Sequence, residues 1–253
     1  MYTDSQDPFF RYPTQDPPQG HRIFCFPHGG SGSSHYFAWS RFYPGKLAIL
    51  PVFLPGRDHR LRERPYEAFS DLLDDLVPSM RTVVDERPYS LYGHSMGCAI
   101  AFEVARALSE DGHSPSRLIV SGSVAPNLRE PIAGLSVLPD DEFIKEITRR
   151  YQGIPPEVLQ HAELMEILIP LLRADVKLME SYQFAPGAAL SCPIHCFGGL
   201  DDSSVPKESL EPWKLHTEGT FQLEMLPGNH FFHLQHAKSI LDTAFCQAFD
   251  WIR

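Results

Sequence analysis

Short apolar runs alternate along this chain with longer segments in which apolar residues recur every three or four positions. Such runs are typical of buried strands, and the wider spacing is typical of helices that bury one face. Strands that alternate with helices predict a mostly parallel, doubly wound α/β sheet. The predicted strands are 22–26, 47–53, 90–92, 117–121, 193–197 and 221–226, and the predicted helices are 69–83, 98–108 and 237–249.

The strand signal stops between residues 126 and 186. Helical spacing replaces it at 140–151, 156–161 and 164–182. A helical insertion that follows a strand of the sheet is placed to cover the sheet edge where ligands bind. We therefore expect residues 126–186 to form a helical lid on a core of 21–125 and 187–253. Residues 1–20 are polar and rich in Asp, Gln and Pro, which predicts a flexible N-terminal tail.

One pentapeptide carries the strongest chemical signal, Gly93-His94-Ser95-Met96-Gly97. It lies between an apolar run and a segment with helical spacing. Gly-x-Ser-x-Gly at a strand-to-helix turn presents a strained, exposed serine as a nucleophile. The flanking glycines let strand and helix approach closely. The pattern predicts Ser95 as a nucleophile.

A serine hydroxyl needs a base and an acid that orients the base, in the order Ser, Asp or Glu, His in an α/β-hydrolase. His230 lies in a turn after the last predicted strand, and Asp201 and Asp202 follow the strand before it. Asp202 fits the pattern Gly-x-x-Asp-x-x-Val, and we favour it over Asp201. The predicted fold is thus an α/β-hydrolase fold with a helical lid.

Two backbone amides must stabilise the negative charge that develops during such a reaction. One comes from the residue after the nucleophile and the other from the loop after an early strand, which indicates Met96 and Gly29. No metal site is predicted. Cys192, His195 and Cys196 alternate like a core strand without a second ligand pair, and the histidines at 230, 233 and 236 have no carboxylate partners nearby.

Composition narrows the class of protein further. The 253 residues suffice for one large domain, and the formal net charge of −10 disfavours non-specific binding to nucleic acid. No run of 18 apolar residues and no secretory leader is visible, and the five cysteines are scattered in apolar runs. We expect a cytoplasmic monomer with reduced thiols.

Five motifs are distributed along the chain, Phe26-Pro27-His28-Gly29-Gly30, Leu54-Pro55-Gly56-Arg57, Gly93–Gly97, Pro170–Asp175 and Gly228-Asn229-His230-Phe231-Phe232. Together they resemble the type II thioesterases, the discrete editing hydrolases of polyketide and non-ribosomal peptide biosynthesis. The resemblance covers nearly the whole chain, and it implies a Ser95, Asp202 and His230 triad with Gly29 and Met96 as the oxyanion hole. Many relatives have Ala in place of Gly29 and Pro in place of Ser203.

The resemblance implies a substrate as well. Stalled or aberrant acyl groups would arrive on the phosphopantetheine arm of acyl or peptidyl carrier proteins, and the enzyme would need no cofactor of its own. Carrier proteins are acidic, so docking needs a local basic patch, for which we suggest Arg57, Arg60, Arg62 and Arg64. A solvated loop with interleaved acids is the alternative for this cluster.

Other functions remain open on the same scaffold. They are a medium-chain fatty acyl thioesterase, a serine esterase or peptidase for small molecules, and a non-catalytic binding module. The apolar lid argues against a peptidase, and the presence of all three triad residues argues against a binding module.

Overall fold

The computed structural model describes residues 2–4, 7–13, 20–129, 134–151 and 159–245. Its centre is a six-stranded sheet in which all strands are parallel, in the order β4-β3-β5-β6-β7-β8. This confirms the predicted α/β class. The central strands carry apolar residues on both faces because helices cover both faces. The strands are β3 (His21–Phe26), β4 (Leu47–Pro51), β5 (Tyr89–His94), β6 (Arg117–Ser121), β7 (Ile194–Gly199) and β8 (Phe221–Leu226).

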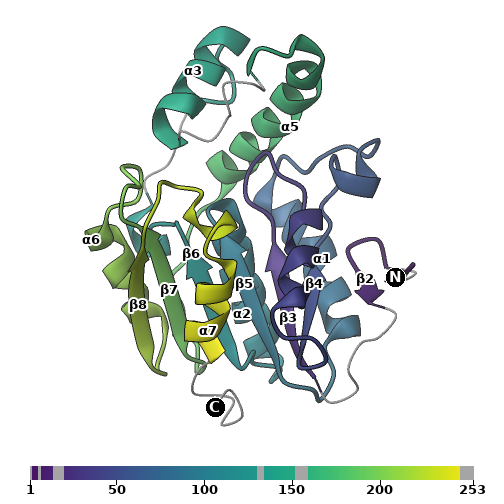
Figure 1. The fold of residues 1–253 in the computed structure, drawn as a ribbon, viewed down its shortest axis with the longest axis vertical. Coiled ribbons are helices and arrows are strands. Elements are labelled where there is room, and N and C mark those ends of the chain that lie inside the picture. The colour runs from purple at the N-terminus through teal and green to yellow at the C-terminus, as the bar shows by residue number, and fades with distance from the viewer. Residues whose placement is uncertain (1, 5–6, 14–19, 130–133, 152–158, 246–253) are drawn as a thin grey trace.

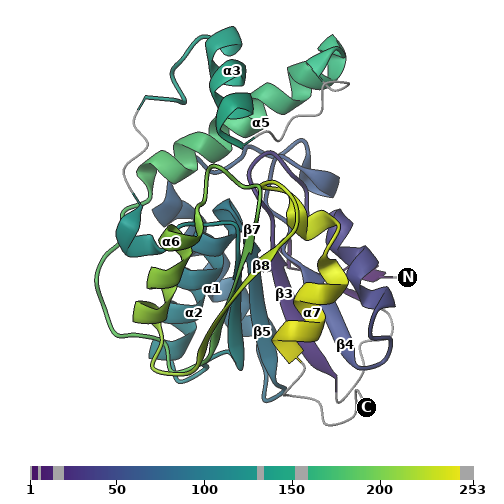
Figure 2. The same cartoon turned by 60° about the vertical axis from the view of Figure 1, so that its left-hand side comes forward.

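Helices lie on both faces of this sheet (Figures 1 and 2). On one face α1 (Phe69–Val83) and α2 (Met96–Glu110) enclose the larger apolar core. On the other face α7 (Ala237–Phe245) and the 3-10 helix η1 (Ser34–Arg41) enclose a second one. Among the described residues, no helix has the length and apolar character needed to span a membrane. Shorter elements are η2 (Asp58–Arg60), η3 (Pro126–Leu128), α6 (Lys207–Leu210), η4 (Glu211–His216) and η5 (Phe232–Leu234).

Two helices of the predicted lid lie beyond the end of the sheet, at the top of Figures 1 and 2. They are α3 (Asp140–Tyr151) and α5 (Ala162–Ser181). Part of α5 contributes Leu178 to the main core, whereas Leu172 packs with residues of α3 in a separate small cluster. The helix α5 therefore connects lid and core. Of the short helix predicted at 156–161, residues 156–158 lie outside the described residues.

The N-terminal segment contains more structure than its polar composition predicts. The strands β1 (Tyr2–Asp4) and β2 (Arg11–Pro13) pair antiparallel. Phe9 and Phe10 between them are 3% and 1% exposed and belong to the main core. The Phe53 amide also donates to the Phe9 carbonyl at 2.9 Å. In its described part, the segment predicted as a flexible tail is thus anchored by two aromatic side chains.

Candidate active site

Ser95 occupies the sharp turn between β5 and α2. Its φ is 52° and its ψ −114°, a backbone conformation that costs a non-glycine residue about 1–3 kcal/mol. The neighbouring backbones leave no room for side chains at the flanking glycines. A Cβ at Gly93 would lie 2.2 Å from the Gly97 carbonyl oxygen, and a Cβ at Gly97 would lie 2.6 Å from that of Phe26. The two glycines therefore permit the close approach that exposes Ser95.

Asp202 and His230 follow β7 and β8, whose carboxyl ends share the sheet edge that carries Ser95. His230 Nδ1 lies 2.7 Å from Asp202 Oδ2, and both side chains are buried, 3% and 2% exposed. The other carboxylate oxygen, Oδ1, accepts from the Ser204 amide at 3.0 Å and from its hydroxyl at 2.6 Å. Asp201 instead accepts from the Gly228 amide at 3.3 Å. Of the two adjacent acids, Asp202 is the one placed against the histidine.

The electrostatics of Asp202 follow from the same contacts. Burial by itself raises the pKa of this carboxyl, but the hydrogen bonds from His230 and Ser204 outweigh it and hold the pKa below its usual value. An ionised Asp202 accepts a proton-bearing Nδ1, so His230 presents Nε2 as the basic nitrogen. That is the tautomer a general base needs.

A cavity of about 810 Å³ brings the predicted groups together. Ser95, Met96, Gly29 and His230 all line it. The remaining wall is mostly apolar, and α5 supplies Leu164, Ile167, Leu168, Leu171 and Leu172. At the end of α3, the Tyr151 ring lies 5.2 Å from the His230 ring, measured between centroids. The lid helices thus form the apolar wall opposite the reactive side chains.

The two predicted oxyanion amides lie in segments suited to hold negative charge. Met96 is the first residue of α2, and the first N–H groups of a helix have no partner inside it. A Cβ added at Gly29 would meet only Asp175 Cβ, at 3.9 Å, so an alanine would fit at this position. The next amide, that of Gly30, donates to Asp175 Oδ2 at 2.7 Å. The Gly29 loop is therefore fixed by a carboxylate of α5.

A buried ion pair that the sequence did not predict completes this connection. Arg57 Nη2 lies 2.7 Å from Asp175 Oδ1, Arg57 Nη1 lies 3.0 Å from Oδ2, and both side chains are 3% exposed. Arg57 also donates to the Ser31 carbonyl at 3.2 Å. In the sequence, Arg57 ends the motif Leu54-Pro55-Gly56-Arg57 and Asp175 ends the motif Pro170–Asp175, and nothing else connects them. The pair ties the lid helix to the loop that carries Gly29.

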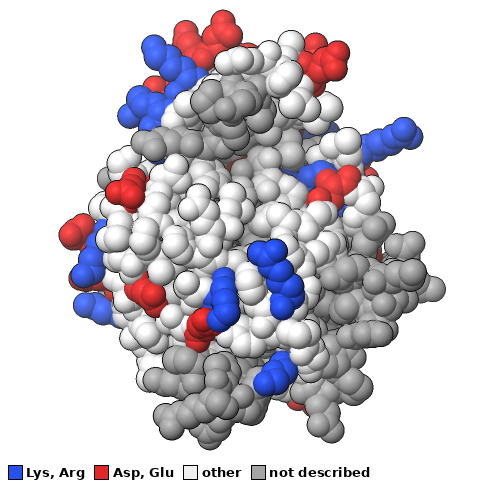
Figure 3. All heavy atoms as spheres, viewed as in Figure 1, with Lys and Arg blue, Asp and Glu red and all other residues white. Residues whose placement is uncertain are grey.

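This burial corrects the predicted docking patch. Arg57 is paired with Asp175, and Arg60 is 7% exposed, with Nη2 2.6 Å from Glu63 and Nη1 2.9 Å from the Phe53 carbonyl. The docking hypothesis is wrong for these two, because a partner cannot reach them. Arg62 and Arg64 are exposed. On the face in Figure 3, basic side chains near the lid lie beside acidic ones.

His230 and His233, which are three positions apart in the sequence, have different neighbours in the fold. The ring of His230 contacts Asp202. His233 instead lies with His28 and His35, which are far from it in the sequence. Cys192 and Cys196 are buried as free thiols. Sequence spacing gave no signal for the group of His28, His35 and His233.

The parallel sheet, the serine turn and the acid–histidine pair define an α/β-hydrolase. Residues 21–247 match the family described as thioesterase domain, and the chain belongs to this family. It is therefore a thioester hydrolase.

Individual relatives agree with this assignment. The chain is 38% identical over 212 residues to the gramicidin S biosynthesis protein GrsT of Aneurinibacillus migulanus. The matched region covers 83% of this chain and 82% of that protein. The medium-chain S-acyl fatty acid synthase thioesterase of Homo sapiens is 30% identical over 234 residues, 90% and 86% of the two chains. The solved structure of the type II thioesterase BorB from the borrelidin biosynthetic cluster matches this one with a TM-score of 0.85 and 33% sequence identity. The match covers 96% of this chain and 98% of the BorB chain.

Proposed function

We propose that this thioesterase removes aberrant or stalled acyl groups from the phosphopantetheine arm of carrier proteins in polyketide or non-ribosomal peptide biosynthesis. The observation that carries the proposal is that Ser95 and His230 line one mostly apolar cavity, with His230 held by Asp202, on a chain related to proteins of such pathways. The catalytic residues would be Ser95, Asp202 and His230, with the amides of Gly29 and Met96 as the oxyanion hole.

Acylation would begin when His230 Nε2 takes the proton of the Ser95 hydroxyl as Oγ attacks the thioester carbon. The carbonyl electrons move to oxygen, and the amides of Gly29 and Met96 stabilise the resulting oxyanion. Collapse of this intermediate breaks the carbon–sulfur bond. The phosphopantetheine thiolate leaves and takes the proton from His230, which leaves the acyl group as an ester on Ser95.

Deacylation would repeat these steps with water. His230 takes a proton from water as the oxygen attacks the acyl carbon, and it returns the proton to Ser95 Oγ when the ester bond breaks. Asp202 keeps the ring orientation and stabilises the imidazolium in both halves. Because a thiolate leaves far more readily than an amine, general-acid assistance matters less here than in peptide cleavage.

Docking of the carrier protein is proposed at Arg62 and Arg64, the exposed remainder of the predicted patch. Arg64 is 83% exposed at its side chain and lies 3.6 Å from Glu67, so its charge is accessible. Charge reversal of both residues should raise KM for acyl carrier protein and leave KM for a small acyl thioester unchanged. An equal response of the two substrates would contradict the docking site.

Acyl release tests the proposed function directly. Carrier-bound acetyl, propionyl and longer acyl groups are compared with the same acyl groups on coenzyme A and with p-nitrophenyl esters. We expect the highest kcat/KM for carrier-bound substrates and no release of any by Ser95→Ala. Equal turnover of free esters and carrier-bound groups would overturn the carrier assignment, and activity in Ser95→Ala would overturn the nucleophile.

The apolar cavity supports a second candidate, a medium-chain fatty acyl thioesterase. Its volume of about 810 Å³ and the leucine-rich wall from α5 suit a chain of several methylene groups. A kcat/KM that rises steadily with acyl length, irrespective of the carrier, would favour this function over editing.

We also propose a cytoplasmic location. The described thiols Cys25, Cys98, Cys192 and Cys196 are all free and buried. This supports a reducing compartment.

A further inference from the structure

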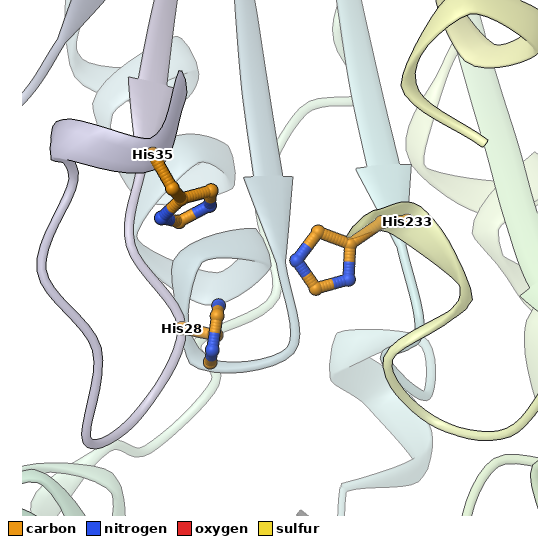
Figure 4. Close-up of side chains that lie close together, drawn as sticks. All are labelled: His28, His35 and His233. Carbon is orange, nitrogen blue, oxygen red and sulfur yellow. The ribbon is translucent and has the colours of Figure 1, made fainter. Parts of the chain in front are cut away.

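Three histidines lie close together at the loop that carries Gly29. His28 lies in that loop, His35 in η1 and His233 in η5. One ring nitrogen from each of the three lies within 4.8 Å of the other two. The three rings come from separate segments and surround a common space (Figure 4). The fold therefore concentrates three imidazoles at a place where no role in thioester hydrolysis requires them.

The orientation of His35 is that of a metal-binding histidine. Its Nδ1 lies 3.0 Å from the Gly32 carbonyl oxygen, which only accepts hydrogen bonds, so Nδ1 carries the proton. The lone pair is then on Nε2, which is buried and has no hydrogen-bond partner among the described residues. Histidines that bind metals commonly donate the other N–H to a backbone carbonyl in this way.

The other two rings also present nitrogens without partners. His233 is 0% exposed, and neither Nδ1 nor Nε2 has a hydrogen-bond partner in the described part of the chain. The same holds for Nδ1 of His28, which is 8% exposed. Buried polar nitrogens are almost always satisfied in proteins, so this concentration calls for a ligand that accepts several lone pairs at once.

The charges around the cluster are compatible with a cation. Burial lowers the pKa of His28 to about 3 and holds the pKa of His233 well below its usual value, so these rings are neutral at pH 7. The carboxylate of Asp58 acts on His35, and the nearby positive charge of Arg57 is paired with Asp175. Neutral imidazoles are good ligands for zinc and the divalent ions next to it in the first transition row.

We propose that His28, His35 and His233 form a binding site for a divalent ion of the zinc type. Three imidazole nitrogens would supply three ligands, and water would supply the fourth, entering from the cavity that His28 also lines. The three nitrogens lie within 4.8 Å of one another, and bonds of about 2.1 Å to one ion would draw them closer together. Bound there, the ion would link the Gly29 loop to η1 and η5.

Metal titration of the whole chain tests this site. Chelator-treated protein is titrated with zinc chloride by calorimetry and with cobalt chloride by visible absorption, which reports tetrahedral coordination without any assay of hydrolysis. We expect one ion per chain, and affinity weaker by about 10-fold or more in His35→Gln. The control is His113→Gln, which replaces an exposed histidine elsewhere and should leave the affinity unchanged.

A ligand swap separates coordination from general damage to the fold. His35→Cys retains a metal-binding side chain and should restore binding, with a new sulfur-to-cobalt charge-transfer band in the near ultraviolet. Thermal unfolding of the metal-free variants checks their folding, and His233→Asn replaces His35→Gln if the latter fails to fold.

Two results would overturn the proposal. One is zinc binding that is equally tight in wild type and His35→Gln. The other is binding that His230→Gln abolishes while His35→Gln retains it, which would assign the ion to the proposed catalytic base. The nucleophile of thioester hydrolysis is tested separately by Ser95→Ala.

Discussion

Gly29 and Gly97 lie on the two sides of the proposed oxyanion hole, yet the space around them differs. A Cβ at Gly97 overlaps the Phe26 and Pro27 carbonyl oxygens, at 2.6 and 2.8 Å, whereas a Cβ at Gly29 is in ordinary contact at 3.9 Å. Backbone atoms cannot rotate away as a side chain can. The difference therefore predicts opposite outcomes for the same substitution.

Gly97→Ala should lower the free energy of unfolding by about 1–3 kcal/mol and reduce kcat, because the turn at Ser95 must open. Gly29→Ala should stabilise the fold by up to about 1 kcal/mol, since it restricts the unfolded chain without strain, and should retain activity. Urea unfolding and acyl-thioester kinetics on both variants measure these effects. A loss of stability in Gly29→Ala would show that the loop has a different conformation.

The adjacent acids give a second matched pair. Asp202→Asn should lower kcat by up to about 10⁴-fold, because an amide no longer fixes the tautomer of His230 or stabilises its imidazolium. Asp201→Asn retains an acceptor for the Gly228 amide and should leave kcat unchanged. Steady-state kinetics on the two variants distinguish the acids. A larger loss in Asp201→Asn would reverse their assignment.

The candidate triad could be predicted because each member follows a strand and the order along the chain is that of one fold class. The choice between Asp201 and Asp202 rested on a short pattern, since two neighbouring loop residues point in directions that turn geometry decides. The structure supplies this geometry, with Asp202 Oδ2 2.7 Å from His230 Nδ1. The histidine cluster was beyond prediction, because its three members are brought together only by the fold.

At the scale of the elements, the helix α5 has two structural roles. It contributes leucines to the cavity wall, and it carries Asp175, which binds Arg57 and the Gly30 amide. Loss of one partner from a buried ion pair leaves an uncompensated charge. The lid helix and the proposed oxyanion loop should therefore respond together to a change at Asp175.

Asp175→Asn should lower the free energy of unfolding by about 3–5 kcal/mol and reduce kcat for every acyl substrate, since Arg57 loses its counter-charge and the Gly29 loop its anchor. Asp140→Asn is the matched control. Asp140 pairs with Arg173 at 2.6 Å but is 66% exposed at its side chain, so its loss should cost less than about 1 kcal/mol. Denaturant unfolding compares them. Equal effects would mean that the buried pair contributes little.

Long elements were predicted well and short ones were not. The bounds of α1 and α3 agree with the sequence prediction because a sustained apolar period marks a helix clearly. The 3-10 helix η1 and the strands β1 and β2 are too short, or too polar, to show a period.

The exposure of Arg57 was predicted wrongly for a related reason. A charged loop residue is usually exposed, and its buried partner Asp175 is 118 positions away.

Across the whole molecule, burial changes the pKa of many histidines. The chain has 12 histidines, and burial holds the pKa below its usual value in His21, His28, His35, His94, His195, His216 and His233. These lie on strands, loops and 3-10 helices throughout the fold. Each is a ring that is neutral when folded and becomes protonated once unfolding exposes it to mildly acidic water.

The sign of the resulting pH dependence is fixed by these depressed values. Below the unfolded pKa of about 6.5 the unfolded chain binds more protons than the folded chain, so stability falls as the pH falls. For His21 and His195 the loss continues until the folded pKa of about 4 is reached. Each such histidine contributes up to about 1.4 kcal/mol per pH unit within that window. The protein should therefore lose stability steeply between about pH 6.5 and pH 4.

Replacement of a single ring isolates one part of this slope. His195 lies on β7, and its Nδ1 is buried with no hydrogen-bond partner among the described residues, so His195→Leu removes a titrating group without breaking a hydrogen bond of that nitrogen. Urea midpoints at about pH 7 and about pH 5 should differ less in His195→Leu than in wild type. The matched control is His113→Leu, which replaces an exposed histidine after α2 and should keep the wild-type difference. An unchanged slope in His195→Leu would mean that this ring already accepts a proton in the folded protein.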